Sequence, residues 1–135
     1  MIKKETNKIL PPQPTEETEQ MLLFQWAELF SCKYAELKLL LHVPNGGKRG
    51  KAEAGRLKAM GVKAGVPDVF LPVPRGNLHG LWIELKRIRS GRPTTEQKEW
   101  IASLNGQGYA AYICHGWEQA SKVILAYLAG KQIPL

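Results

Sequence analysis

The chain has 135 residues, 44% of them hydrophobic, so it is long enough for one domain with a core and too short for two of ordinary size. Nineteen Lys and Arg against twelve Asp and Glu give a net charge of +7, which favours a polyanionic partner such as nucleic acid or an acidic membrane surface. The apolar stretches are far shorter than the roughly 20 residues that span a bilayer, and the N-terminus lacks a signal-peptide apolar region, so we expect a cytoplasmic, intracellular protein without a membrane partner.

The hydrophobic periodicity and the turn residues predict three helices, four strands and a short helical insertion between residues 15–130. In chain order these elements are helix 15–34, strand 37–45, helix 51–61, strands 66–73 and 80–87, helix 94–104, strand 108–116 and helix 118–130. The order α-β-(α)-β-β-α-β-α predicts one α/β domain with a mixed four-stranded sheet flanked by helices. Residues 1–14, which end in LPPQP, predict a flexible N-terminal arm, and residues 131–135 a short tail.

Some side chains within these elements have a predicted environment. Leu23, Ala27 and Phe30 recur at helical spacing and are expected to face the core. Cys32 and Cys114 are isolated in apolar surroundings, without zinc-site spacing or the density of a disulfide scaffold. We therefore expect both cysteines to be reduced thiols in the core.

Charged residues interrupt two of the apolar strands. Asp68 opens one strand, and the next contains Glu84 and Lys86, which project from the same face because they are two residues apart. A hairpin-like connection would bring Asp68 next to Glu84, where the two carboxylates repel unless a cation such as Mg²⁺ lies between them. A Mg²⁺ ion held by Asp68, Glu84 and the backbone carbonyl of Leu85 would suit phosphodiester hydrolysis, with Lys86 orienting water or stabilising the transition state. From spacing alone, a surface Glu-x-Lys ion pair beside a turn aspartate explains these charges equally well.

Pro67-Asp68 followed by Glu84-Leu85-Lys86 resembles the motif of the PD-(D/E)XK nuclease superfamily. The run HVPNGGKR…GVPDVFLPVPRG…GLWIELK…QKEWI…GY is similar to the stand-alone VRR-NUC domains of phage and bacteria, over about residues 15–128. The resemblance implies a restriction-endonuclease-like core with catalytic Asp68, Glu84 and Lys86. It also implies a Mg²⁺ cofactor that Mn²⁺ can replace, and it is compatible with a phage origin.

The first helix of that family contributes a glutamate near its start and a glutamine four residues later, which match Glu16 and Gln20. Glu16 is therefore a candidate catalytic residue and metal ligand, with Gln20 supporting it. Glu19 and Glu17 compete for the same role, and an acidic first turn needs no function at all, because the helix dipole favours it.

Two more polar residues match family positions. Gln97 corresponds to a glutamine that points toward the active site, although it also completes a T-x-x-Q capping box with Thr94. Asn45, in the P-N-G-G turn, is a supporting candidate with an equally good explanation as a turn residue. His42, at a strand end, is expected to be structural or substrate-facing rather than a metal ligand.

Basic residues lie on both sides of the proposed metal site in the sequence. Such a distribution suits a track for the phosphate backbone, although any single member is also an ordinary solvated side chain. The candidate DNA-binding residues are Lys48, Arg49, Lys51, Arg56, Lys58, Lys63, Arg87, Arg89 and Arg92.

The sequence and the resemblance together predict a Mg²⁺-dependent, structure-selective DNA endonuclease. The stand-alone relatives are similar to homodimeric enzymes that act on Holliday junctions, so a homodimer and a branched DNA substrate are expected by analogy. Two alternatives remain open. One is a non-catalytic, basic nucleic-acid-binding module of the same fold, and the other is an interaction subunit that docks a partner through VILAYL of the final helix.

Overall fold

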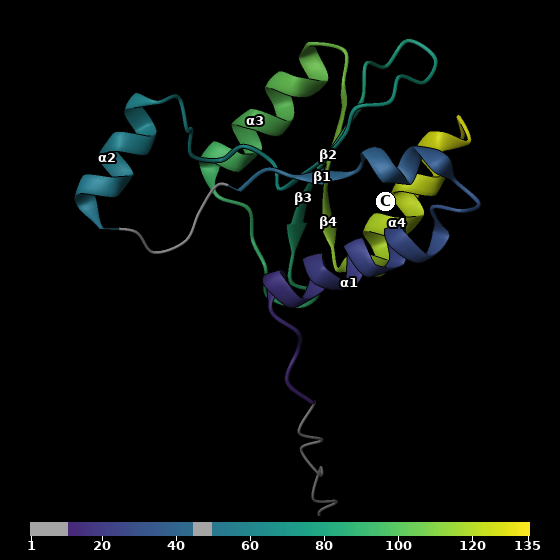
Figure 1. Cartoon of the computed structure of the whole chain (residues 1–135), viewed down its shortest axis with the longest axis horizontal. Helices are drawn as coiled ribbons and strands as arrows, with labels where there is room; N and C mark the ends of the chain where they lie inside the picture. The colour runs from purple at the N-terminus through teal and green to yellow at the C-terminus, as the bar shows by residue number, and fades with distance from the viewer. Residues whose placement is uncertain (1–10, 45–49) are drawn as a thin grey trace, which may run out of the picture.

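The computed structural model describes residues 11–44 and 50–135, which form a mixed four-stranded sheet flanked by helices (Figure 1). The elements are α1 (Glu16–Phe30), the 3₁₀ helix η1 (Ala35–Leu39), β1 (Leu41–His42), α2 (Lys51–Ala59), β2 (Val69–Leu71), β3 (Leu81–Lys86), α3 (Thr95–Gly106), β4 (Ala110–His115) and α4 (Trp117–Leu128). The sheet order is β1-β2-β3-β4, with β1–β2 and β2–β3 antiparallel and β3–β4 parallel. The predicted fold class is confirmed.

Helix α1 begins as the sequence predicts and ends earlier. The Thr15 hydroxyl accepts a hydrogen bond from the Thr18 N–H at 3.1 Å, which satisfies one of the free donors of the first turn. Leu23 and Ala27 are buried, but Phe30 is 42% exposed, so its predicted place in the core is wrong. The helix stops at Phe30, and the residues that follow turn away toward η1.

The cysteines differ from each other. Cys114 lies in β4 and is fully buried, as predicted. Cys32 is exposed in the turn after α1, so the expectation of a core thiol is wrong for this residue. The prediction fails because the helix ends before Cys32, and the apolar pattern around it belongs to two different elements.

The strand predicted at 37–45 is mostly absent. η1 covers its beginning, and β1 has only two residues, both exposed at the edge of the sheet. Leu37 and Leu40 are buried, whereas Leu39 and Leu41 are 52% and 41% exposed. A spacing of three residues between buried leucines fits one turn of a 3₁₀ helix. Because the apolar run is continuous, its pattern does not distinguish a 3₁₀ helix from a buried strand.

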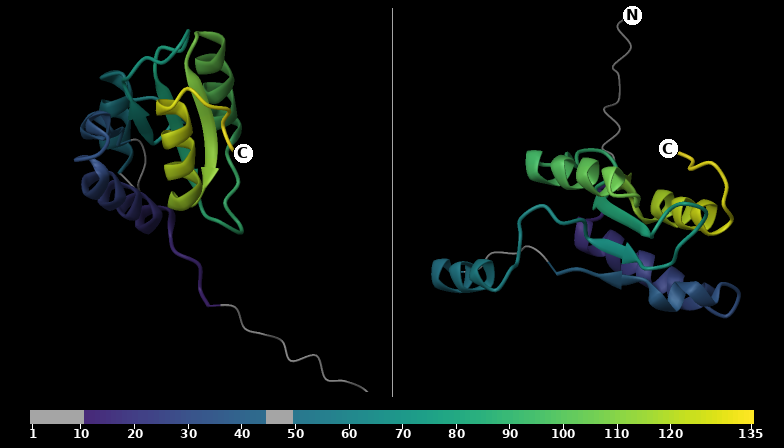
Figure 2. Two further views of the ribbon diagram at one scale, coloured as in Figure 1. Left: turned by 90° about the vertical axis from the view of Figure 1, so that its right-hand side faces the viewer. Right: turned by 90° about the horizontal axis from the view of Figure 1, so that it is seen from above.

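Parallel strands need a crossover, and α3 supplies it between β3 and β4. The predicted capping box is present at its start: Thr94 Oγ1 accepts from Gln97 N at 3.2 Å, and Gln97 Oε1 accepts from Thr94 N at 2.8 Å. Figure 2 shows α4 on one side of the sheet and α3 on the other.

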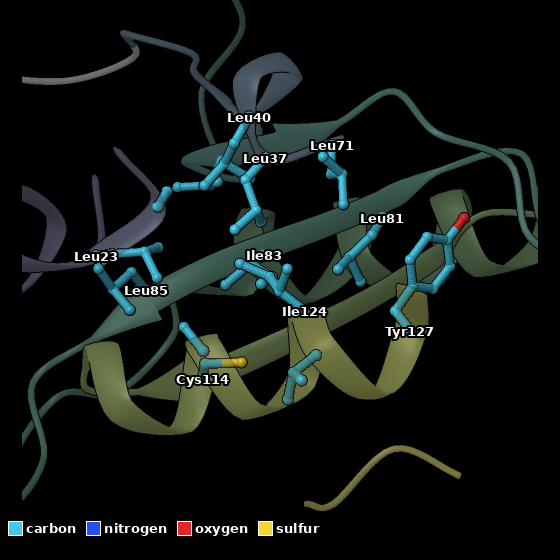
Figure 3. Close-up of a cluster of buried hydrophobic side chains, with 14 of the residues drawn as sticks. Leu23, Leu37, Leu40, Leu71, Leu81, Ile83, Leu85, Cys114, Ile124 and Tyr127 are labelled. Atoms are coloured by element: carbon cyan, nitrogen blue, oxygen red, sulfur yellow. The ribbon is translucent and has the colours of Figure 1, made fainter. Parts of the chain in front are cut away.

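The hydrophobic core lies between the sheet and the helices α1 and α4 (Figure 3). Leu23 from α1, Ile83 and Leu85 from β3, and Ile124 and Tyr127 from α4 are all at most 2% exposed. Full burial of such a side chain contributes roughly 1.5 to 3 kcal/mol. The apolar face of α4 is thus used within the domain, which removes the basis for docking a partner through VILAYL.

Helix α2 stands apart from the rest of the molecule in Figure 1 and in the right-hand view of Figure 2. Every residue of α2 is exposed except Leu57, which is half-buried. Propensity and local hydrogen bonds therefore support this short helix more than packing does. Within residues 11–44 and 50–135, none of the helices is long and apolar enough to cross a membrane.

Candidate active site

Two carboxylates meet where β2 begins and β3 ends. The register sets Val69 opposite Ile83, so Asp68, one residue before β2, falls opposite Glu84. Directly opposed residues share a face of the sheet, with Cβ atoms about 4.5 to 5.5 Å apart. Lys86, two residues further along β3, projects from that face too. The structure thus brings together the three charges that interrupt the apolar strands.

The backbone of Leu85 lies between these carboxylates. Its N–H donates to Asp68 Oδ2 at 2.8 Å, in the place where an antiparallel neighbour would offer a main-chain carbonyl. Continued by two residues, the β2–β3 register sets Pro67 opposite Leu85, and proline has no N–H to donate. The Leu85 carbonyl therefore receives no ladder hydrogen bond from position 67, and Leu85 lines the cleft described below.

The site holds more negative charge than its surroundings neutralise. Burial, and then the nearby Asp68 carboxylate, raise the pKa of Glu84 from 4.5 to about 8, against the opposing effect of Lys86. Burial also raises the pKa of Asp68, although the Leu85 N–H and Lys86 act in the opposite direction. Glu84 Oε2 is buried and has no hydrogen-bond partner among the described residues. An orphaned, desolvated carboxylate oxygen beside a second carboxylate is a suitable position for a cation.

The ammonium of Lys86 lies between two carboxylates. Its Nζ is 3.4 Å from Glu84 Oε1 and 3.6 Å from Glu16 Oε1. The Lys86 side chain is 7% exposed and that of Glu16 is 44% exposed, so the ion pair with Glu84 is the more strongly desolvated one. Glu16, from the first turn of α1, thereby joins the site through Lys86.

Glu16, Asp68, Glu84 and Leu85 line a cleft of about 540 Å³ at the end of the sheet. The residues that line it are Glu16, Glu17, Gln20, Met21, His42, Pro44, Asp68, Glu84, Leu85 and Gln97. The cleft therefore includes the predicted Glu16, Gln20 and Gln97, while Gln97 Oε1 is also engaged in the capping box. Asn45, the other supporting candidate, lies outside the described residues.

Glu19 has a different place from Glu16. It is 1% exposed, and its Oε2 accepts a hydrogen bond from the Trp117 N–H at 2.7 Å. Helix α4 begins after Gly116, which has no side chain to cap it, and the buried Glu19 carboxylate supplies the missing acceptor. Of the three competing glutamates, Glu16 and Glu17 line the cleft and Glu19 does not, and Glu16 is the one paired with Lys86.

His42 lines the cleft in a way that the sequence does not specify. Its Nδ1 lies 2.8 Å from the main-chain oxygen of Asp68, and that oxygen also accepts from Val43 N at 2.8 Å. Since a carbonyl only accepts, Nδ1 carries a proton in this contact. The imidazole thus holds the backbone of Asp68 in place. The signals for it in the sequence are its position at the end of a predicted strand and its place at the start of the family-like run HVPNGGKR.

No three His, Cys, Asp or Glu side chains gather as a metal cluster within the described ranges. A metal here would have Asp68, Glu84 and the Leu85 carbonyl as ligands, and water or substrate would complete the shell. This donor set is all oxygen, and it suits Mg²⁺, which usually keeps several waters and takes one or two carboxylates.

The predicted DNA-binding residues occupy two regions. Lys51, Arg56 and Lys58 lie on the exposed helix α2, and Lys63 follows it. Arg87, Arg89 and Arg92 lie in the loop between β3 and α3, where Arg87 is half-buried. Lys48 and Arg49 lie outside the described residues.

A mixed sheet that carries Pro-Asp and Glu-x-Lys side by side at one end defines the class of PD-(D/E)XK nuclease folds. The chain belongs to the VRR-NUC domain family, whose model matches residues 16–118. A solved structure described as a VRR_NUC domain protein is similar to it, with 29% identity and a TM-score of 0.75 over 93% of this chain and 100% of that chain. No curated protein matches the chain. The family predicted from the sequence is confirmed, and with it a nuclease-type fold.

Proposed function

We propose that the protein is a Mg²⁺-dependent DNA endonuclease that hydrolyses phosphodiester bonds at the cleft beside Asp68 and Glu84. The observation that carries this proposal is the buried Oε2 of Glu84, which lacks a hydrogen-bond partner in the described part of the chain and lies opposite a second carboxylate and next to Lys86. When bound there, Mg²⁺ would polarise the phosphodiester and lower the pKa of a coordinated water.

The protein side chains supply the other requirements of hydrolysis. Lys86, held by Glu84 and Glu16, has ammonium protons that can donate to a phosphoryl oxygen as charge develops on it. The Leu85 N–H donates to Asp68 Oδ2 and so fixes the orientation of this carboxylate beside Glu84. A water adds to phosphorus, the bridging P–O bond breaks, and the leaving oxygen takes up a proton.

The test is a cleavage assay on linear and four-way-junction DNA with Mg²⁺, with Mn²⁺ and with EDTA. We expect cleavage in either metal and none in EDTA. Asp68→Asn, Glu84→Gln and Lys86→Ala should each abolish cleavage and still bind DNA, because the phosphate contacts come from other residues. Glu118→Gln, an exposed carboxylate on α4, serves as the matched control and should cut normally. Binding without cleavage in any metal would favour the non-catalytic module.

We also propose, by analogy with stand-alone relatives, that the protein is a homodimer that prefers branched DNA. Each small active site cuts one strand, so symmetric cleavage of a junction needs a two-fold pair. Light scattering should give twice the monomer mass, and junctions should be cut faster than linear duplex. A monomer that cuts both substrates equally would refute this part of the proposal alone.

A further inference from the structure

The segment Pro11 to Pro14, at the end of the arm predicted to be flexible, is hydrogen-bonded to the loop after β3. Gln13 uses both ends of its amide: Oε1 accepts from Arg89 N at 3.0 Å, and Nε2 donates to Ser90 Oγ at 2.6 Å. In return, Arg89 Nη2 donates to the Pro11 carbonyl at 2.9 Å. Arg87 Nη2 donates to the Gln13 carbonyl at 3.5 Å, a long contact.

The loop that receives these bonds needs support. Residues 87–94 are neither helix nor strand, and they directly follow Lys86, which pairs with Glu84 and Glu16. On the inner side, Gly91 lies so close to the end of β3 that a Cβ there would be 2.6 Å from Arg87 N. On the outer side, Gln13 bonds the main chain of Arg89. The loop is therefore held from both sides, with Gln13 as the outer contact.

The arm holds these arginines without neutralising them. The acceptors that Pro11 and Gln13 offer to the guanidinium groups of Arg89 and Arg87 are main-chain carbonyls, which carry no net charge. In the described part of the chain, the ion pairs formed by basic side chains are those of Arg75 and Lys86. A guanidinium has five N–H donors in a fixed fork, so each arginine keeps its full charge beside these contacts. Arg87 Nε is buried and has no hydrogen-bond partner among the described residues, so a phosphate would be met by the Nη atoms of Arg87.

We propose that Gln13 is a positioning residue for DNA binding: it fixes the loop between β3 and α3 so that Arg87 and Arg89 present their charge to a DNA phosphate strand entering the cleft. The inference rests on the proposed function for its DNA substrate, and it requires no bound metal. Because the amide of Gln13 is needed to bridge Arg89 N and Ser90 Oγ, Gln13 acts through the loop and not by contacting DNA itself.

The experiment measures DNA affinity in EDTA across a series of salt concentrations, for the full chain and four variants. These variants are Gln13→Ala, the double Arg87→Ala/Arg89→Ala, the triple that combines them, and Gln25→Ala as an exposed glutamine control on α1. Loss of the Gln13 amide should weaken binding about fivefold, corresponding to about one hydrogen bond. The double variant should reduce the slope of log K against log salt by up to about 1.8, at about 0.9 per phosphate contact.

The decisive comparison is the triple variant against the double variant. If Gln13 acts through the arginines, removing it from the double variant costs no further affinity, and the melting temperatures of all variants stay close to that of the native chain. A further fivefold loss in the triple variant would overturn the proposal, as would tighter binding by Gln13→Ala, which would mean that the arm competes with DNA. An unaffected double variant would overturn it too, whereas failure of the native chain to bind any DNA would refute the proposed function itself.

Discussion

The carboxyl group of Glu84 is in an environment where an isolated charge is unfavourable. Its side chain is 1% exposed, it faces Asp68 across the β2–β3 register, and one of its oxygens has no protein donor within the described residues. A residue that served only the core would be apolar at this position. A buried carboxylate lowers stability, and binding a cation would account for its presence. Strain of this kind is typical of functional sites.

The raised pKa of Glu84 makes the stability of the metal-free protein depend on pH. The folded state keeps a proton up to about pH 8, whereas the unfolded chain releases it near 4.5. The contribution of this carboxyl to the unfolding free energy is therefore fully present below about pH 4.5 and declines as pH rises toward 8, by at most about 1.4 kcal/mol per pH unit. Urea denaturation in EDTA at pH 5, 6, 7 and 8 measures this change in unfolding free energy.

Glu84→Gln is the control for this pH effect, because the amide has the same shape and does not titrate. Its unfolding free energy should fall less over the same range, and Mg²⁺ at pH 8 should stabilise the native chain and not the variant. If the unfolding free energies of the two proteins fell equally with pH, the Glu84 carboxyl would not be the group that causes the pH dependence.

The two thiols should differ strongly in reactivity. Burial raises the pKa of Cys114 to about 12, so the reactive thiolate does not form at neutral pH. The side chain is also 0% exposed, so a reagent cannot reach the sulfur. Cys32 is exposed in the turn after α1. In the folded protein a thiol reagent should label Cys32 alone, and Cys32→Ser should abolish the fast labelling; Cys114 should react only after denaturation. Two equally fast thiols would show that β4 opens readily.

At the scale of elements, the first turn of α1 links two helices. Glu19 is buried and caps the start of α4 through Trp117 N. We predict that Glu19→Ala lowers the unfolding free energy by about 1 to 3 kcal/mol, because it leaves the part-buried N–H of Trp117 without its acceptor. Glu28→Ala, an exposed glutamate of the same helix, should change stability little. Thermal or urea denaturation compares them, and equal stability of the two variants would exclude the capping role.

Some elements follow from local signals and others do not. Alternating charges in Trp82-Ile83-Glu84-Leu85-Lys86 and the turn before them specify β3 and its pairing, because strand periodicity places the charges on one face. The strand predicted at 37–45 is wrong over most of its length, because four leucines in five positions fit a strand and a 3₁₀ turn equally well. Glu16 and Glu19 are three residues apart in one acidic turn, so only the three-dimensional packing distinguishes the cleft residue from the cap.

At the scale of the whole molecule, contacts between distant segments are the ones that sequence patterns do not show. Gln13 bonds Ser90 across 77 positions, and neither segment has a periodicity that indicates the other. The same holds for Arg75, which reaches Glu36 at 3.2 Å and the Leu128 carbonyl at 3.0 Å. The motif residues define the site, whereas the surfaces around it depend on how the loops are folded back onto the sheet.

The position of α2 gives a final prediction for the whole molecule. It extends away from the sheet (Figure 1) and carries Arg56 and Lys58, which are exposed. Arg56→Ala/Lys58→Ala should therefore leave stability unchanged but weaken DNA binding and lower the salt slope by up to about 1.8, because fewer counterions are displaced from the phosphates. Lys122→Ala/Lys131→Ala removes equal charge from another region and is the matched control. If both double variants reduce binding equally, the net charge of the protein determines affinity, and direct contacts between α2 and DNA do not.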